Sequence, residues 1–303
     1  MQNIVSSLKM ETWLKKWRSA TAWTDINQRN PLIPLICDMD LQKLTYNVCD
    51  LAKEVGEFLK QEITKLKSTD ILSKGLHNYV TYVDKESERR IVERLSTLLP
   101  GSGFIAEENA ALRPGEYTWV IDPLDGTTNF IHGVPLYCIS IGLMHHDETI
   151  LAMVYEPNLQ ECFYTWKSAP SYLNGEIIRV SQTPAVNEAL FATGFPYYDY
   201  RRLDDYLAIF KHLLQNSRGA RRLGSAAADL AYTACGRYDG FYEYGLSPWD
   251  VCAGALLVQN AGGVVSDFCG TKNYIFGKQI IAANHSLYSE FLKLFDAWKH
   301  ELI

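Results

Sequence analysis

The residues of this chain best suited to chemistry are two aspartates, three positions apart, in the segment WVIDPLDGTTNF at residues 119–130. The apolar residues before Asp122 predict the end of a buried strand, and the proline after it predicts a stiff turn. The glycine after Asp125 allows a sharp backbone turn, and the two threonines that follow are good N-cap residues. Carboxylates bind hard divalent cations, whereas free backbone N–H groups bind an anion. The segment therefore favours a phosphate that bridges Mg²⁺ ions.

An ordinary turn is the competing interpretation, because Asp-Pro and Asp-Gly are common turn pairs. Two further acidic positions favour a site instead. Glu107 directly follows the short apolar run at residues 104–106, and Asp250 stands beside Trp249 at the start of an apolar, helix-like stretch. Acidic residues at the ends of buried strands are costly unless a cation meets them. We therefore expect these acids to share a cation site.

Composition and charge exclude several classes of protein. The 303 residues are 47% hydrophobic, enough to bury a large core in one domain or in two halves. The net charge of −6 argues against a nucleic-acid-binding surface, so no nucleic acid partner is expected. No apolar run approaches ~20 residues, so no membrane span is expected.

The cysteines and the N-terminus bear on the cellular compartment. The seven cysteines are odd in number and form no CxxC pair, which argues against a disulfide framework or a zinc site. The N-terminus lacks the basic-then-apolar pattern of a signal peptide. Both features predict a cytoplasmic protein with reduced thiols.

Strands are needed to bring the acids together, and apolar runs predict them. Residues 103–106 and 117–121 indicate neighbouring strands, whose C-terminal ends would deliver Glu107, Asp122 and Asp125 to one edge of a sheet. Three successive antiparallel strands are predicted next, at residues 136–144, 149–155 and 161–166.

Helices are indicated by apolar residues at a period of 3.6. A helix is predicted over residues 41–59, and Asp84 is placed at the N-cap of a helix that opens at Lys85. After residue 181 helices alternate with short strands, including a helix at 251–260 and a closing helix at 286–300. We predict an α/β (α+β) layered sandwich of alternating αβαβα layers, with a mostly antiparallel N-terminal sheet and a C-terminal α/β sheet.

The chain divides into three predicted stretches. Residues 1–38 do not resemble the rest and are interpreted as an N-terminal extension of uncertain role; our hypothesis is that Met39 is the functional start. The alternative is an arm that packs on the body or on a second subunit. Residues 39–182 form the predicted N-terminal α+β half that binds metal and phosphate, and residues 183–303 the α/β half that completes the site.

Three motifs together resemble one known family. WVIDPLDGTTNF at residues 119–130, AEEN at 106–109 and WDVCAGALLVQNAGG at 249–263 resemble the inositol monophosphatase family of Mg²⁺-dependent, commonly Li⁺-sensitive phosphatases, in its bacterial type. The resemblance runs from about Asp84 to Ala283. Ala106 stands where the family more often has Gly, and Cys252 replaces a usual Ala. Neither change removes a ligand.

The resemblance implies a set of metal and phosphate contacts. It implies two or three Mg²⁺ ions held by the side chains of Glu107, Asp122, Asp125 and Asp250 and by the carbonyl of Leu124. The N–H groups of Gly126 and Thr127 would bind the phosphate. The implied catalytic residues are Glu107, with Asp84 and the Thr127 hydroxyl, which would position a metal-activated water for direct in-line attack.

The substrate contacts implied by the resemblance are Glu243 and the backbone near Ala226, with Asp125 and Asp250 beside them. These contacts, together with ATGFPY at residues 192–197, favour hydrolysis of myo-inositol monophosphate to inositol and phosphate. An alternative for Glu243 is a structural ion pair with one of three arginines, Arg221, Arg222 or Arg237.

Two further functions stay open. On the same metal core, a 3'(2'),5'-bisphosphate nucleotidase or a fructose-1,6-bisphosphatase would need an extra basic cluster, which Arg218, Arg221 and Arg222 would provide. A non-enzymatic alternative is a protein partner of the transcription machinery, as some bacterial relatives are. The resemblance also implies a homodimer.

Overall fold

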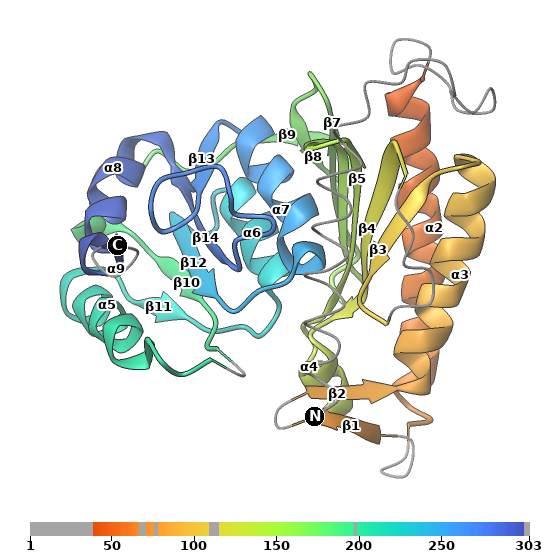
Figure 1. The fold of residues 1–303 in the computed structure, drawn as a ribbon, viewed down its shortest axis with the longest axis horizontal. Helices are drawn as coiled ribbons and strands as arrows, with labels where there is room; N and C mark the ends of the chain where they lie inside the picture. Colours follow the sequence, from red (N-terminus) through yellow and green to blue (C-terminus); the bar gives the residue numbers. More distant parts are fainter. Residues whose placement is uncertain (1–38, 67–70, 76–77, 109–114, 197–198, 300–303) are drawn as a thin grey trace.

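The computed structural model describes residues 39–66, 71–75, 78–108, 115–196 and 199–299, drawn in colour in Figure 1. The hypothesis about residues 1–38 therefore lies outside the described residues. Along the horizontal axis of Figure 1, helices and sheets alternate in five layers. The αβαβα sandwich predicted from the sequence is confirmed.

The first sheet has seven strands in the order β3-β4-β5-β6-β7-β8-β9. Only β3 and β4 are parallel, and every later neighbour is antiparallel. Its strands are β3 Gly103–Ala106, β4 Tyr117–Asp125, β5 Cys138–His145, β6 Glu148–Glu156, β7 Glu161–Trp166, β8 Ser171–Leu173 and β9 Glu176–Ile178.

The second sheet has five strands in the order β11-β10-β12-β14-β13, mixed in direction. Its strands are β10 Phe191–Thr193, β11 Ala220–Arg221, β12 Gly240–Tyr244, β13 Gly263–Ser266 and β14 Gln279–Asn284. A small hairpin, β1 Ile71–Gly75 with β2 Asn78–Thr81, stands apart from both sheets.

Helices cover both sheets and fill the space between them (Figure 1). The outer layer beside the first sheet is α2 Leu41–Glu62 with α3 Tyr82–Leu98, and the middle layer is α6 Ala226–Ala234 with α7 Pro248–Asn260. The outer layer beside the second sheet is α5 Leu203–Asn216, α8 His285–Lys293 and α9 Asp296–Lys299. Short elements are α4 Thr127–Ile131 and the 3₁₀ turn η3 Val186–Glu188.

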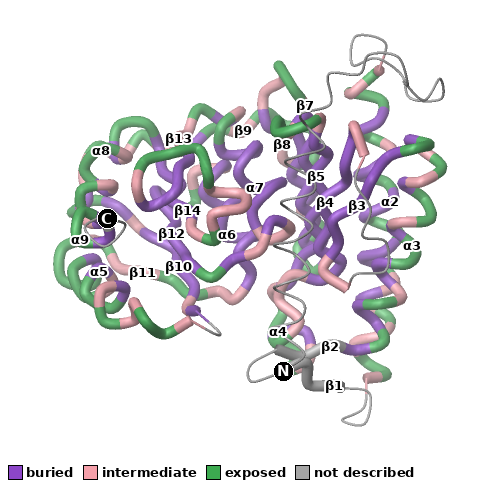
Figure 2. Tube along the Cα trace, viewed as in Figure 1, coloured by how far each residue is buried: buried purple, intermediate pink, exposed green. Residues whose placement is uncertain are grey.

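The position of each helix follows from its apolar residues. Helix α2 buries one stripe that includes Val48 and Val55 and exposes its other side, as the period of 3.6 predicts. Helix α7 is apolar nearly all round, and it is buried between the two sheets (Figure 2). Gly254 permits this close packing, because a Cβ there would lie 2.5 Å from Leu230 Cβ of α6.

Three predicted boundaries are wrong. Helix α3 begins at Tyr82 rather than Lys85, so its N-cap is Thr81 and Asp84 is the third helical residue. Helix α7 begins at Pro248, which suits the first helical position, so Asp250 lies within its first turn. The predicted closing helix is broken into α8 and α9.

The first sheet ends at Ile178 and the second begins at Phe191. The division of the chain at residue 182 stays a prediction. None of the helices among the described residues combines the length and the apolar character that crossing a membrane requires.

Candidate active site

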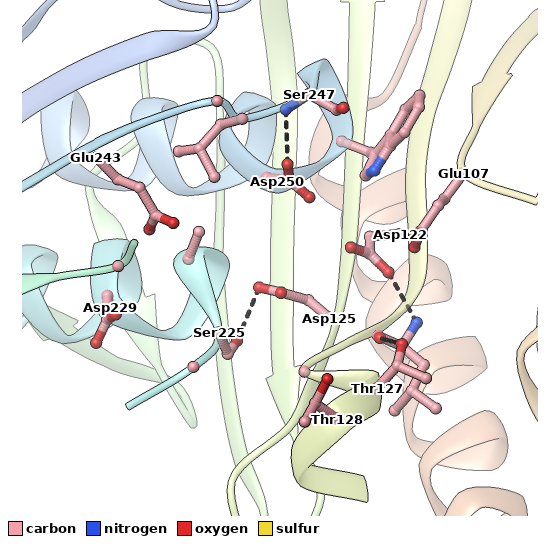
Figure 3. A pocket seen from close by; sticks show the side chains of 18 of the residues that line it. Glu107, Asp122, Asp125, Thr127, Thr128, Ser225, Asp229, Glu243, Ser247 and Asp250 are labelled. Carbon is pink, nitrogen blue, oxygen red and sulfur yellow. Dashed lines mark hydrogen bonds between the residues drawn. The ribbon is translucent and has the colours of Figure 1, made fainter. Parts of the chain in front are cut away.

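A polar cavity opens where the end of β4 meets the first turns of α6 and α7 and the end of β12. One wall carries the acids of the DPLD segment, and the opposite wall carries Glu243 and Asp229 (Figure 3). Nine of the ten residues singled out from the sequence line this cavity: Glu107, Asp122, Leu124, Asp125, Gly126, Thr127, Ala226, Glu243 and Asp250. The tenth, Asp84, lies behind Thr127.

Asp122 and Asp125 are brought to the same side by an irregularity in β4. A turn was predicted after Ile121, but the strand continues to Asp125, and its register against β5 shifts between the two aspartates. Pro123 cannot donate a ladder hydrogen bond, so a bulge is a natural place for it. An extra residue changes the alternation of side chains, and both carboxylates therefore face the cavity.

The two aspartates differ in their partners. Asp122 Oδ1 accepts a hydrogen bond from its neighbour Leu124 N at 2.9 Å. Asp125 Oδ2 instead reaches α6, where it accepts from Ser225 Oγ and from Ala227 N, both at 2.7 Å. Asp125 thus connects the first sheet to the middle helices.

Asp250 joins them from the first turn of α7. Ser247 N donates to Asp250 Oδ2 at 2.6 Å, and the two residues form a capping box. Carboxylate oxygens of Asp122, Asp125 and Asp250 all lie within 4.8 Å of one another. Glu107, which follows β3, extends its side chain toward Asp122 (Figure 3).

This gathering of acids is electrostatically unfavourable by itself. Burial raises the pKa of Asp122 well above its ordinary value, and the charges of Glu107, Asp125 and Asp250 raise it further. Burial also raises the pKa of Asp125 to about 6, although the hydrogen bonds that Asp125 accepts from Ser225 and Ala227 act to lower it. Burial also raises the pKa of Asp250 well above its ordinary value, and the charge of Asp125 raises it further.

The donor set fits a hard divalent cation. Six acids line the cavity, four of them on the wall of the DPLD segment and α7, and neither His nor Cys lines it among the described residues. Oxygen-only ligands are those preferred by Mg²⁺, and a dication would remove the mutual repulsion of the acids. Leu124 also lines the cavity, and its carbonyl oxygen lies 3.0 Å from Thr127 Oγ1. It is one of two acceptors within reach of the single Thr127 hydroxyl proton, the other being Asp84 Oδ1.

The N-terminus of α4 provides the anion-binding half of the site. Gly126 caps α4 with a φ of 99°, a left-handed conformation that glycine adopts readily. The first N–H groups of a helix have no partner within it, and they lie here beside the acids. The arrangement can hold an anion next to a cation.

Asp84 is connected to this end of the cavity through Thr127. Thr127 Oγ1 lies 3.1 Å from Asp84 Oδ1, and Asp84 Oδ2 accepts from Thr81 N and Thr81 Oγ1 at 2.8 and 2.7 Å. Burial raises the pKa of Asp84. The predicted N-cap role of Asp84 is wrong, but its carboxylate does belong to a capping box, in which Thr81 is the cap.

The opposite wall is formed by β12 and α6. Burial raises the pKa of Glu243 to about 8, while the charge of Arg222 lowers it. Gly194 leaves the space that Glu243 occupies, because a Cβ on Gly194 would lie 2.0 Å from Glu243 Oε1. Asp229 lines the same wall and was missed from the sequence. Its position three residues after Ala226, on one face of a helix, was the available signal.

The arginines do not form the ion pair or the cluster considered from the sequence. Arg237 pairs with Glu161, with Nη1 to Oε2 at 2.5 Å, and Arg221 is exposed. No described arginine forms an ion pair with Glu243. Of the three arginines proposed for a second phosphate, only Arg222 lines the cavity.

Asn129 is a second residue that sequence reasoning missed. Its Nδ2 donates to the carbonyls of Leu136 and Leu223, at 2.7 and 2.8 Å. Leu223 lies just before α6, so the Asn129 side chain connects α4, beside the acids of the DPLD segment, to the opposite wall of the cavity. Its partners are distant in sequence, and no local pattern indicates them.

Known proteins resemble this chain over most of its length. A sequence profile of the inositol monophosphatase family matches residues 40–299. Nus factor SuhB of Pseudomonas aeruginosa is 42% identical, over 80% of this chain and 91% of that protein. An inositol-1-monophosphatase of Mesorhizobium japonicum is 35% identical, over 80% and 92%. The solved structure of an inositol monophosphatase from Anabaena (Nostoc) sp. is 35% identical, with a TM-score of 0.75, over 84% of this chain and 96% of that one.

Proposed function

Because the chain belongs to the inositol monophosphatase family, we propose that it is a Mg²⁺-dependent phosphomonoesterase that hydrolyses myo-inositol monophosphate to inositol and phosphate. The observation that carries the proposal is the convergence of Asp122, Asp125 and Asp250 within 4.8 Å, beside the N-terminus of α4. An acidic cluster next to free N–H groups suits a phosphate ester and its counter-ions better than any other common ligand.

Each acid has a proposed role. Glu107, Asp122, Asp125 and Asp250, with the Leu124 carbonyl, would hold two or three Mg²⁺ ions. When bound, Mg²⁺ would neutralise the charge of the phosphate and lower the pKa of a water molecule that it binds. The N–H groups of Gly126 and Thr127 would hold the phosphate oxygens in line with the attacking water.

Thr127 and Asp84 would orient that water. The Thr127 hydroxyl lies within hydrogen-bond distance of Asp84 Oδ1, and donation to Asp84 leaves its oxygen to accept a hydrogen bond from the water. A proton leaving the water would then pass toward the Asp84 carboxylate, whose raised pKa makes it a better base. The water oxygen would bond to phosphorus as the ester oxygen departs. The departing alkoxide would take up a proton from solvent water, and the Asp84 carboxyl would return its proton to solvent.

The proposed substrate contacts come from the far wall and the metal acids. Glu243 and the backbone of Ala226 would bind ring hydroxyls, with Asp125 and Asp250 beside them. A bisphosphate substrate is disfavoured, because two carboxylates and a single arginine line the wall that a second phosphate would meet.

Relative rates test this choice of substrate. The purified protein should hydrolyse myo-inositol 1-phosphate with Mg²⁺, with higher kcat/KM than for fructose 1,6-bisphosphate or adenosine 3',5'-bisphosphate, and EDTA should abolish the activity. A preference for either bisphosphate would overturn the inositol assignment, and no turnover of any phosphoester would overturn the phosphatase itself. Adding Li⁺ to the same assay tests the expected sensitivity.

The relative named Nus factor SuhB supports a second candidate function, that of a protein partner of the transcription machinery. This role needs a surface rather than a working site. Asp122→Asn should abolish hydrolysis but leave capture of transcription proteins in a pull-down at native salt unchanged. Absence of capture by the wild-type protein would remove this candidate.

Assembly and location belong to the same proposal. We expect a homodimer, as the resemblance implies, and a cytoplasmic location, as the cysteine pattern predicts. Light scattering on the full chain should give twice the monomer mass; a monomer mass at assay concentration would contradict it.

A further inference from the structure

Asp229 is a buried acid that the proposed reaction does not use. It lies in the first half of α6, only 1% exposed, and it lines the cavity on the same wall as Glu243. Figure 3 shows both acids on the side opposite Asp122. Residues three apart on a helix share a face, so Asp229 lies one turn along α6 from Ala226, whose backbone is a proposed substrate contact.

The Asp229 carboxylate has no partner among the described residues. Its Oδ1 is buried without a hydrogen bond, and no described group donates to the other oxygen. Burial raises the pKa of Asp229 well above its ordinary value, the charges of Glu243 and Asp125 raise it further, and Arg222 opposes them. A buried polar group without a partner is costly, and native proteins keep few of them.

The neighbours of Asp229 restrict what can satisfy it. Glu243 makes no hydrogen bond to a described side chain, and the carboxylate of Glu243 is packed over Gly194. Two carboxyl groups on one wall offer several acceptors to hydroxyl donors and repel a phosphate. A ring that carries adjacent hydroxyls matches this wall, whereas a small or aromatic alcohol leaves it unsatisfied.

We propose that Asp229 is a specificity-determining residue that accepts a hydrogen bond from a hydroxyl of the leaving polyol, beside the hydroxyl bound by Glu243. This inference rests on the proposed function and adds a residue to it. The wall then selects a cyclic polyol monophosphate over esters that lack ring hydroxyls.

The test compares Asp229→Ala and Asp229→Asn with wild type in two measurements. The first is KM for myo-inositol 1-phosphate. The second is the inhibition constant of inorganic phosphate. It reports only the wall that carries Asp122, Asp125 and Asp250, which we call the metal wall. Asp229→Ala should raise KM at least about tenfold, as expected for losing a hydrogen bond to a charged group, and leave the phosphate inhibition constant within twofold. Asp229→Asn keeps one acceptor oxygen and should show a smaller rise.

Asp239→Asn is the matched control. Asp239 lies in the same half and outside the cavity, and its Oδ2 accepts from Leu190 N at 2.6 Å. The control should lower the melting temperature and leave KM unchanged. Asp229→Asn should not lower the melting temperature, because burial opposes the charge of Asp229 and the amide carries none.

Two results would overturn the inference. Equal changes in KM and in the phosphate inhibition constant would show that Asp229 supports the whole site, and an unchanged KM in Asp229→Ala would show that no hydroxyl contacts it. Failure of the wild-type protein to hydrolyse any phosphoester would instead refute the proposed function, so the two failures are distinguishable.

Discussion

The two walls of the cavity are both acidic, but they are held in different ways. Each aspartate of the metal wall accepts a hydrogen bond from a nearby backbone N–H: Asp122 from Leu124, Asp125 from Ala227 and Asp250 from Ser247. On the opposite wall, Glu243 and Asp229 accept none from described residues. The metal wall is preorganised by the protein before any ligand arrives, whereas the opposite wall is completed only by what binds to it. Preorganisation suits charge stabilisation, and unsatisfied acceptors suit recognition.

The largest effect should come from the centre of the metal wall. Asp122→Asn keeps the volume of the side chain and removes its charge, so we expect kcat/KM to fall at least about a thousandfold, as for loss of a main electrostatic group. The metal-free variant should be at least as stable as wild type, because burial and three nearby acids oppose the charge of Asp122. Kinetics with Mg²⁺ and a thermal melt check both. Near-normal turnover would refute a central role for Asp122.

A smaller loss should follow from disconnecting Asp84. Thr127→Ala removes the hydroxyl between Asp84 and the Leu124 carbonyl, and we expect kcat to fall about a hundredfold, within the range for general acid–base groups. Thr128→Ala is the matched control, since Thr128 lines the cavity but its hydroxyl makes no described hydrogen bond. Its effect on kcat should stay below about tenfold. Equal losses of kcat in the two variants would show that both substitutions disturb the backbone of α4, and would contradict a specific role for the Thr127 hydroxyl.

The opposite wall can be changed without touching an acid. Gly194→Ala would place a Cβ 2.0 Å from Glu243 Oε1, and the flexible carboxylate must move away. We expect KM for myo-inositol 1-phosphate to rise about tenfold through the displaced hydrogen bond, with the phosphate inhibition constant unchanged. A fall in kcat with KM unaltered would contradict the separation of the two walls.

The smallest effect concerns stability and pH. The pKa of Asp125 is raised to about 6 and that of Glu243 to about 8 in the folded protein, both by burial. The folded protein therefore binds more protons than the unfolded chain above the ordinary carboxyl pKa, so stability falls as pH rises from about 4 through these values. The melting temperature of the metal-free protein should drop by a few degrees between pH 5 and pH 8.

Adding Mg²⁺ should separate the contributions of the two walls to the change in melting temperature with pH. The cation would offset the part due to the metal acids, and the part due to Glu243 should persist until Glu243→Gln removes it. Thermal melts with and without Mg²⁺, at both pH values, measure each part. A pH dependence that Mg²⁺ abolishes completely would show that Glu243 does not change its ionisation between these pH values.

Much of the fold was predictable because its signals are local. The stripe of α2 follows a period of 3.6, the strands of the first sheet appear as apolar runs, and the layered sandwich follows from their order. The wrong boundaries were also local in origin. Thr81 and Ser247 each begin a capping box with an acid three residues on, so each helix begins before its acid, whereas the apolar period predicted that it begins after it. The bulge at Pro123 depends on pairing with β5, which no single strand reveals.

The sequence by itself determined which acids form the metal wall, because DPLDGTTN puts two carboxylates, a glycine and helix-opening threonines within one short segment, and because Glu107 and Asp250 each stand at the end of an apolar stretch. Only the tertiary structure decided that Asp229 and Gly194 join Glu243 opposite that wall. Gly194 directly follows β10, Asp229 lies in α6 and Glu243 lies in β12, and their meeting depends on how α6 packs between two sheets. A buried carboxylate such as Asp229 looks in sequence like any helical surface acid, because burial is a property of the assembled layers and not of the residue.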